Sequence, residues 1–411
     1  MKKIYGVIGM PADKSITQRA IIIAAMAEGE TSIENFPRSE NCILTAKAMR
    51  QYVDGAMDKP FYCGGSAFLA RALCGVLVGQ DKDCDITGSK ELSKRPMKRV
   101  IEPIEMMDAG IISDDWHLPL KVLGGIRLHG ITYDMPLASA EVKSAILFAG
   151  LFANGPTVVV EKQKTRNHTE NLLKAFGANI KVEDKACGHK ITLTPGNALK
   201  GIKLHIPGDF SSGAFFITLA TIVEGSSLRI NDLGLNETRT RLIDIIERMG
   251  GEIEKINLRV AGFSPQEEEF EELVGDINVN GRKLTATTVS GEDIPGAIDE
   301  LPLVALLGAF AEGETVLKDA SELRYKECDR IKAICENLSA MGVDITETDD
   351  GFIVRGGNAD DYHDAKINSY GDHRIAMTMA IMKSLIGGEI EEEECVKASY
   401  PEFYDTLRAL V

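Results

Sequence analysis

A repeated unit recurs along this 411-residue chain, and it limits the possible folds more than any other feature. Each copy opens with a turn that contains Pro, Gly or Ser. Polar residues, an almost wholly apolar segment, a Gly-containing turn and a strand-like segment follow. Such self-similarity indicates a fold built from copies of one supersecondary unit. The copies open at Gly9, Cys63, Asp134, Ile206, Ile294 and Ser369.

The apolar segment of each copy predicts a helix that is buried within a domain. Four segments show this best: 21–27, 145–151, 214–217 and 303–307. A helix that is apolar on every side has no face suited to water, so other elements must surround it. In most copies a second, amphipathic helix follows and ends at a glycine, the residue expected just past a helix C-terminus. Six such copies are more chain than one hydrophobic core usually holds. They therefore predict two α/β domains of three units each.

The charge of the chain excludes several classes of function. Its formal net charge is −16, which argues against general binding of nucleic acids or anionic membranes. Its longest apolar runs are too short to span a bilayer and no apolar leader is present at the start, so we expect a cytoplasmic protein. Asp13 occupies the second glycine position of a P-loop-like segment, and no zinc-type spacing of ligands occurs. We therefore expect neither a metal nor a nucleotide cofactor.

The starts of the predicted buried helices have features that favour anions. Backbone N–H groups at a helix N-terminus carry positive partial charge, and several such ends facing one gap would form an anion site. The turns also carry cationic and hydroxyl side chains that suit phosphate and carboxylate groups: Lys14, Ser15, Thr17, Arg19, Ser139, Ser211, Ser212 and Arg374. Further basic residues lie away from these turns: Lys94, Arg95, Arg324, Lys326, Arg330 and Lys397.

Seven segments resemble the signatures of the 5-enolpyruvylshikimate-3-phosphate synthase family, in that family's order and over nearly the whole chain. They are 14–20 (KSITQRA), 94–96 (KRP), 139–144 (SAEVKS), 236–239 (NETR), 299–302 (DELP), 323–330 (LRYKECDR) and 372–377 (DHRIAM). The resemblance implies two domains, each an inside-out α/β barrel of three βαβαββ repeats, joined by two hinge strands. With its help we expect residues 13–208 to form the shikimate 3-phosphate-binding lobe. Residues 1–12 and 209–411 would form the phosphoenolpyruvate-binding and catalytic lobe.

The activity that the resemblance implies is transfer of the enolpyruvyl group of phosphoenolpyruvate to the 5-hydroxyl of shikimate 3-phosphate, with release of phosphate. By the family pattern, the residues for proton transfer are Lys14, Asp299 and Glu327. The residues for shikimate 3-phosphate are Lys14, Ser15, Arg19, Ser139, Ala140, Glu141, Thr165, Asp299 and Lys326. The residues for phosphoenolpyruvate are Lys14, Ala67, Arg95, Glu141, Arg330, Arg374 and Lys397. The family also leads us to expect a monomer that needs only these two small molecules as partners.

Four positions depart from the family pattern. Asn41 stands where the family tends to have Asp. Glu141 stands where the family usually has Gln, and a carboxylate cannot donate a hydrogen bond to an anion. Aligned through Arg71, Ala67 replaces a glycine and Phe68 replaces a small polar residue. Two alternatives remain open at this point. One is the UDP-N-acetylglucosamine enolpyruvyl transferase branch of the same fold, and the other is a divergent, non-catalytic repeat protein.

Overall fold

The computed structural model describes residues 2–185, 188–261 and 272–411, and these form an α/β protein. They divide into two compact units. The terminal unit contains both chain ends: the residues up to Asp13, Pro207–Val260 and Glu272–Val411. The 14–206 unit comprises Lys14–Ile206. Within the described residues, no helix combines the length and apolar content needed to cross a membrane.

The 14–206 unit contains two four-stranded sheets of one design. Their strand orders are β3-β4-β6-β5 and β7-β8-β10-β9, where the first pair is parallel and the other pairs are antiparallel. Along the chain the second sheet forms in the βαβαββ order that the resemblance implies, and the first follows the same order with one additional short helix, α4 (Lys90–Ser93). In the third copy only the parallel pair β2-β11 forms. The strands are β2 (Ser32–Glu34), β3 (Phe61–Tyr62), β4 (Cys84–Thr87), β5 (Ile111–Asp114), β6 (His117–Val122), β7 (Thr132–Asp134), β8 (Thr157–Glu161), β9 (Asn179–Lys185), β10 (Gly188–Thr194) and β11 (Lys203–His205).

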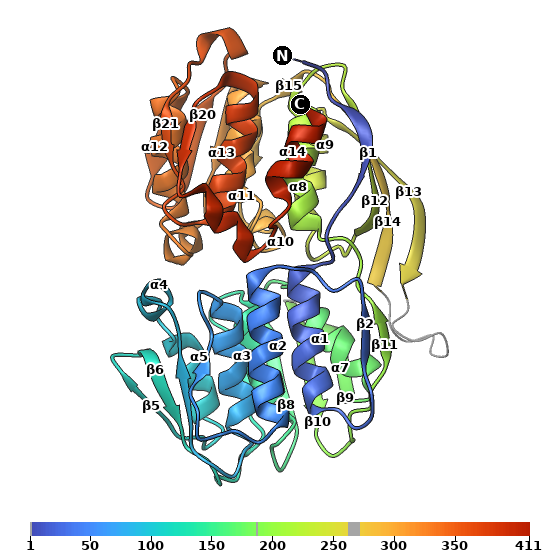
Figure 1. The fold of residues 1–411 in the computed structure, drawn as a ribbon, viewed down its shortest axis with the longest axis vertical. Helices are drawn as coiled ribbons and strands as arrows, with labels where there is room; N and C mark the ends of the chain where they lie inside the picture. The colour runs from blue at the N-terminus through green and yellow to red at the C-terminus, as the bar shows by residue number, and fades with distance from the viewer. Residues whose placement is uncertain (1, 186–187, 262–271) are drawn as a thin grey trace. The chain divides into compact units, whose positions relative to one another are not determined.

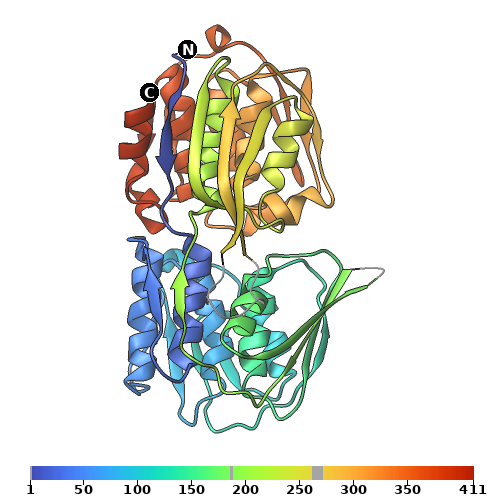
Figure 2. The ribbon, with the colours of Figure 1, turned by 90° about the vertical axis from the view of Figure 1, so that its right-hand side faces the viewer.

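The terminal unit repeats this design with strands from both ends of its chain. Its four-stranded sheets are β1-β12-β14-β13 and β16-β18-β20-β19, and its short pairs are β21-β22 and β15-β17. The N-terminal β1 supplies the parallel edge strand beside β12, as the blue and green strands of Figure 2 show. The strands are β1 (Tyr5–Gly9), β12 (Ser227–Gly234), β13 (Glu252–Ala261), β14 (Glu272–Asn280), β15 (Leu284–Thr285), β16 (Thr288–Val289), β17 (Ala311–Glu312), β18 (Glu314–Leu317), β19 (Asp344–Thr348), β20 (Gly351–Arg355), β21 (Lys366–Asn368) and β22 (Glu389–Glu391).

The apolar segments form buried helices, as predicted. Every residue of α8 and α11 is buried, and these two helices pack with α13 inside the terminal unit (Figure 1). In the 14–206 unit, α3 and α6 pack closely because Gly75 has no side chain; a Cβ there would lie 2.1 Å from the carbonyl oxygen of Ala145. The helices of this unit are α1 (Lys14–Met26), α2 (Glu40–Val53), α3 (Ala67–Leu77), α4 (Lys90–Ser93), α5 (Lys98–Glu105), α6 (Ala140–Gly150) and α7 (His168–Ala175).

The amphipathic helices end at glycines, which confirms the predicted caps. Gly177, Gly250 and Gly342 follow α7, α9 and α12 with φ of +93°, +87° and +87°. This left-handed conformation is open to glycine without steric cost. The helices of the terminal unit are α8 (Phe210–Ile222), α9 (Arg241–Arg248), α10 (Asp293–Ala297), α11 (Leu301–Ala309), α12 (Arg330–Ala340), α13 (His373–Ile386) and α14 (Phe403–Leu410), with 3-10 turns η1 (Ser321–Tyr325), η2 (Ala359–Asp361) and η3 (Glu393–Ala398).

The two segments at which the chain enters and leaves the terminal unit are hydrogen-bonded to each other. Asp13 N–H donates to the carbonyl of Pro207 at 2.8 Å, and Asp209 N–H donates to that of Pro11, also at 2.8 Å. Between them, Ala12 and Gly208 form an antiparallel bridge. We call residues 11–13 and 207–209 the crossover segments.

Asp276 on β14 holds the irregular part of β12, and its replacement should lower stability. Burial acts to raise the pKa of Asp276, but hydrogen bonds from Asp232 N–H, Asn257 and Arg229 outweigh it and lower the pKa to about 2. A carboxyl group whose pKa is lowered on folding contributes stability above its ordinary pKa of 3.8 and loses it as the pH falls toward 2. We expect Asp276→Asn to reduce the free energy of unfolding by about 2 kcal/mol at pH 7 and by roughly half as much at pH 3. Urea unfolding at both pH values tests this against Asp405→Asn, an exposed control; equal losses at the two pH values would contradict it.

Candidate functional site

Three helices of the 14–206 unit begin at predicted site residues. Helix α1 starts with Lys14 and Ser15, α3 with Ala67, and α6 with Ala140 and Glu141. Serine side chains cap two of these starts: Ser66 Oγ accepts from Leu69 N–H at 3.3 Å, and Ser139 Oγ accepts from Val142 N–H at 3.4 Å. Capped helix starts hold their remaining N–H groups in fixed directions, which favours anions near them.

The Arg19 side chain contacts four helices of this unit: α1, α3, α6 and α7. Its Nε donates to Thr169 Oγ1 on α7 at 2.7 Å, and its Nη2 donates to Ser144 Oγ on α6 at 3.3 Å. On α1 itself, Nη1 donates to the carbonyl of Ser15 at 3.0 Å. The guanidinium also lies 4.3 Å from the ring centroid of Phe68 on α3. The aromatic residue that departs from the family pattern therefore packs against a predicted substrate-binding cation.

The second unusual residue, Glu141, also has a partner in the structure. Its carboxylate forms an ion pair with Arg71, whose side chain is buried in α3. Arg71 therefore offsets the negative charge that Glu141 brings to the start of α6. Arg95 lies in the turn between α4 and α5, where its backbone N–H donates to the carbonyl of Leu92 at 2.9 Å.

Thr165 belongs to a buried network of charges. Its hydroxyl and its backbone N–H donate to Glu161 at 2.8 and 3.1 Å. Glu161 also pairs with Lys143 Nζ at 3.1 Å, and the same ammonium group lies 2.6 Å from Glu170. The single hydroxyl proton of Thr165 is thus used inside the protein, and toward a ligand this oxygen can only accept a hydrogen bond.

In the terminal unit, Arg330 is surrounded by carboxylates. Its guanidinium lies 2.7 Å from Asp372, 2.6 Å from Glu327 and 3.5 Å from Asp299. The side chain is only 2% exposed. Burial acts to lower the pKa of Arg330, but Asp372, Glu327 and Asp299 outweigh it, so the pKa lies above its ordinary value and the group stays charged.

A second buried cation, Arg374, shares one of these carboxylates. Its Nη2 lies 3.6 Å from Asp299 and its Nη1 lies 3.8 Å from Glu300. Asp372 joins the two arginines, since it pairs with Arg330 and also caps α13 by accepting from Arg374 N–H at 2.7 Å. Four predicted residues (Asp299, Glu327, Arg330 and Arg374) therefore form one cluster, which we call the Arg330–Arg374 cluster. Its cations and the N-termini of α12 and α13 suit a small dianion.

Two other predicted cations of this unit have separate surroundings. Lys326 follows η1, and its ammonium group lies 3.7 Å from Glu322. Lys397 is exposed on η3, which packs against α13. Asp372 and Glu300 were not among the predicted site residues, although both stand inside segments that carry the resemblance. Glu300 stands immediately before α11 and Asp372 immediately before α13, a position that favours acidic residues whether or not they belong to a site.

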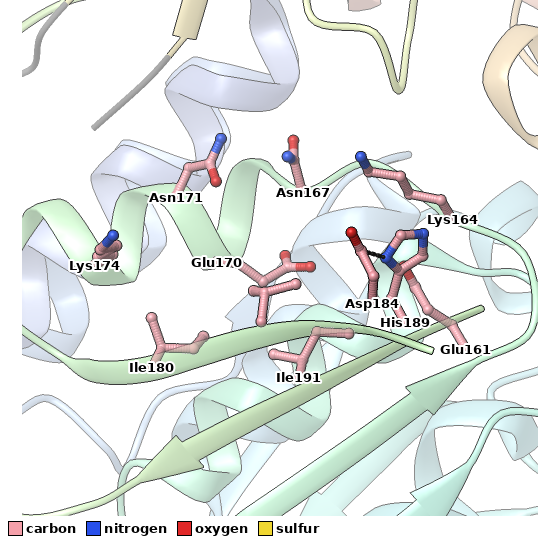
Figure 3. A pocket seen from close by; sticks show the side chains of 11 residues that line it. Glu161, Lys164, Asn167, Glu170, Asn171, Lys174, Ile180, Asp184, His189 and Ile191 are labelled. Carbon is pink, nitrogen blue, oxygen red and sulfur yellow. Dashed lines mark ion pairs between the residues drawn. The ribbon is translucent and has the colours of Figure 1, made fainter. Parts of the chain in front are cut away.

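A pocket of about 490 Å³ lies elsewhere, between α7 and the strands β9 and β10. Figure 3 shows its polar wall, including the ion pair of His189 Nδ1 with Asp184 at 2.7 Å. None of the predicted site residues lines it; the lining residues are Glu161, Lys164, Asn167, Glu170, Asn171, Lys174, Ile180, Val182, Asp184, His189 and Ile191. The candidate site residues therefore fall in two groups, one at the helix starts of the 14–206 unit and one in the Arg330–Arg374 cluster of the terminal unit.

Comparison with known proteins covers the whole chain. A sequence model of the family described as EPSP synthase (3-phosphoshikimate 1-carboxyvinyltransferase) matches residues 1–407. The chain is 39% identical to the 3-phosphoshikimate 1-carboxyvinyltransferase of Oceanobacillus iheyensis, over 99% of this chain and 97% of the relative. It is 41% identical to the 3-phosphoshikimate 1-carboxyvinyltransferase of Thermoanaerobacter sp. strain X514, over 98% of this chain and 97% of the relative.

Solved structures agree with this assignment. The EPSP synthase of Acinetobacter baumannii superposes with a TM-score of 0.82 at 35% identity, over 100% of this chain and 96% of the other. The enolpyruvyl transferase NikO from Streptomyces tendae superposes with a TM-score of 0.75 at 16% identity, over 100% and 95%, which is a likeness of fold alone. The chain belongs to the EPSP synthase family.

Proposed function

We propose that this chain is a 3-phosphoshikimate 1-carboxyvinyltransferase. It transfers the enolpyruvyl group of phosphoenolpyruvate to the 5-hydroxyl of shikimate 3-phosphate and releases phosphate, a step of aromatic amino-acid biosynthesis. The observation that supports this most directly is the pair of buried guanidinium groups, Arg330 and Arg374, among carboxylates in a chain that matches the family model over residues 1–407. Residues 13–208 would serve shikimate 3-phosphate, and residues 1–12 and 209–411 would serve phosphoenolpyruvate and the chemistry.

Binding must first offset the repulsion between two anionic substrates. Two unit charges about 5 Å apart repel by roughly 3 kcal/mol at an effective dielectric constant of about 20. In the proposal Arg95, Arg330, Arg374 and Lys397 hold phosphoenolpyruvate, and Lys14 binds both substrates. The anion then takes over part of the ion pairing that Asp299, Glu327 and Asp372 give to the arginines. Arginine suits this exchange, because its planar fork binds carboxylate and phosphate by two parallel hydrogen bonds.

For the other substrate, the proposal uses the helix starts of the 14–206 unit. Ser15, Arg19, Ser139, Ala140, Glu141 and Thr165 would bind shikimate 3-phosphate, together with Lys326. Ala67, at the start of α3, would lie against phosphoenolpyruvate, as would Glu141. Arg19 supports this assignment because α6 and α7 hold its guanidinium in one orientation. A cation held in this way is preorganised for an anionic ligand.

The chemistry has two steps, each with a proton transfer. In the addition, the 5-hydroxyl oxygen bonds to C2 of phosphoenolpyruvate, the hydroxyl loses its proton, and the methylene carbon C3 gains one. In the elimination, C3 loses a proton and phosphate leaves C2. We assign the hydroxyl proton to Asp299 and the proton transfers at C3 and at the leaving phosphate oxygen to Glu327 and Lys14. Asp299 and Glu327 are partly exposed while Arg330 beside them is buried, so both carboxylates can reach a ligand.

Phosphate release with defined substrates tests the proposal. We expect the purified chain to release phosphate from phosphoenolpyruvate when shikimate 3-phosphate is present, without added metal or nucleotide. It should release none with phosphoenolpyruvate alone, or with UDP-N-acetylglucosamine as acceptor. Release with the UDP-sugar would move the chain to the other enolpyruvyl transferase branch, and release with neither acceptor would reject catalysis. Light scattering on the same sample tests the further expectation that the enzyme is a monomer.

A further inference from the structure

In the terminal unit a third buried arginine, Arg239, binds the two crossover segments. Its Nη1 pairs with Asp13, and its Nη2 lies 3.1 Å from Asp209 Oδ1. The side chain is 2% exposed. Burial acts to lower the pKa of Arg239, but the two carboxylates outweigh it and raise the pKa above its ordinary value. A charged group buried between two acids holds their backbone segments firmly, because separating any member leaves a buried charge uncompensated.

Two hydrogen bonds through one serine connect the same guanidinium group to the Arg330–Arg374 cluster. Arg239 Nη2 donates to Ser211 Oγ at 2.8 Å, and the Ser211 hydroxyl donates to Glu300. Because a serine hydroxyl has a single proton, its acceptance from Arg239 and donation to Glu300 fix the direction of this chain of hydrogen bonds. Glu300 is buried, and its Oε1 lies 3.8 Å from Arg374 Nη1. All of these residues belong to the terminal unit.

We infer that Ser211 is a positioning residue for phosphoenolpyruvate binding, acting through Glu300 on Arg374. Two carboxylates flank the Arg374 guanidinium, with Glu300 beside Nη1 and Asp299 beside Nη2. Ser211 keeps the Glu300 carboxylate 3.8 Å from Arg374 Nη1, which is longer than a direct hydrogen bond. At this distance Glu300 orients Nη1 without binding it closely. Without the hydroxyl, Glu300 moves onto Arg374 and competes with the substrate anion. This inference rests on the proposed function, in which Arg374 binds phosphoenolpyruvate.

Kinetics of Ser211→Ala test the inference. We expect KM for phosphoenolpyruvate to rise roughly tenfold, the size of one hydrogen bond to a charged group, while kcat and KM for shikimate 3-phosphate stay within about twofold. Thr218→Ala is the matched control, because Thr218 is another buried hydroxyl residue of α8. Ser211→Thr, which restores a hydroxyl, should recover most of the loss. A KM for phosphoenolpyruvate equal to that of the control would overturn the inference.

A second variant separates positioning from packing. Glu300→Gln removes the charge that would compete for Arg374, so the double variant with Ser211→Ala should have a KM for phosphoenolpyruvate close to that of Glu300→Gln alone. Multiplied effects in the double variant would show independent roles and contradict the inference. If Ser211→Ala does not fold, an unchanged KM in Glu300→Gln contradicts it equally. Absence of phosphate release by the wild-type chain would instead reject the proposed function, so the two failures are distinguishable.

Discussion

Glu327→Gln is expected to slow turnover by about 10²- to 10⁴-fold, the usual contribution of a positioned acid or base. The Glu327 carboxylate accepts from Arg330 Nη2 at 2.6 Å, and a glutamine can offer its carbonyl oxygen to the same N–H group. The position of Arg330 and the binding of phosphoenolpyruvate should therefore change little. An amide cannot give or take the proton at the methylene carbon, so the loss should appear in kcat. Steady-state phosphate release with both substrates varied measures kcat and the two KM values.

Glu322→Gln supplies the matched control for this prediction. Glu322 lies five residues earlier and pairs with Lys326 at 3.7 Å, while Glu327 pairs with the buried Arg330. We expect kcat of the control to stay within about threefold of the wild type, as for most surface substitutions. A wild-type kcat in Glu327→Gln would remove Glu327 from the mechanism. A large rise in KM with unchanged kcat would make it a binding residue only.

Much of the fold could be predicted from the repeat, because its signals are local. Residues 214–217 and 303–307 are apolar on every side, and in the structure they lie in wholly buried helices. The reduced third copies could not be predicted in the same way. Strand β2 pairs with β11, whose residues are about 170 positions later in the chain, and such distant pairing leaves no periodic pattern in a single sequence.

The candidate site was predicted residue by residue, but its ion pairs were not. Arg330 and Arg374 stand in recognisable segments, whereas Asp372 was not predicted as a site residue, although it lies in the same segment as Arg374. The Asp372 carboxylate caps α13 and also pairs with Arg330 at 2.7 Å. Glu141 raised a similar difficulty, since its partner Arg71 is 70 residues away. Ion pairs of this kind depend on tertiary packing, which brings side chains together without any fixed spacing in the sequence.

Arg330→Met is expected to abolish turnover and to lower the free energy of unfolding by about 3–5 kcal/mol, because it leaves carboxylates buried without their cation. Asp372 is fully buried and loses its 2.7 Å partner entirely. Arg355→Met is the control, because Arg355 also pairs with two carboxylates, Glu314 and Asp344, but is 61% exposed. We expect the control to lose under about 1 kcal/mol. Urea unfolding and phosphate release on the same preparations give both quantities, and a similar loss of stability in the two variants would contradict the prediction.

The double variant Arg330→Met/Asp372→Asn separates the two roles of the Arg330–Arg374 cluster. The neutral amide introduced at position 372 removes the buried negative charge, and its oxygen can still accept from Arg374 N–H, which Asp372 does at 2.7 Å. Stability should therefore recover by about 1–3 kcal/mol relative to Arg330→Met alone, as for two residues in one network. Turnover should not recover, because the cation that binds the substrate anion is still missing. Recovery of both would mean that Arg330 acts only through stability, while recovery of stability alone assigns it to the substrate.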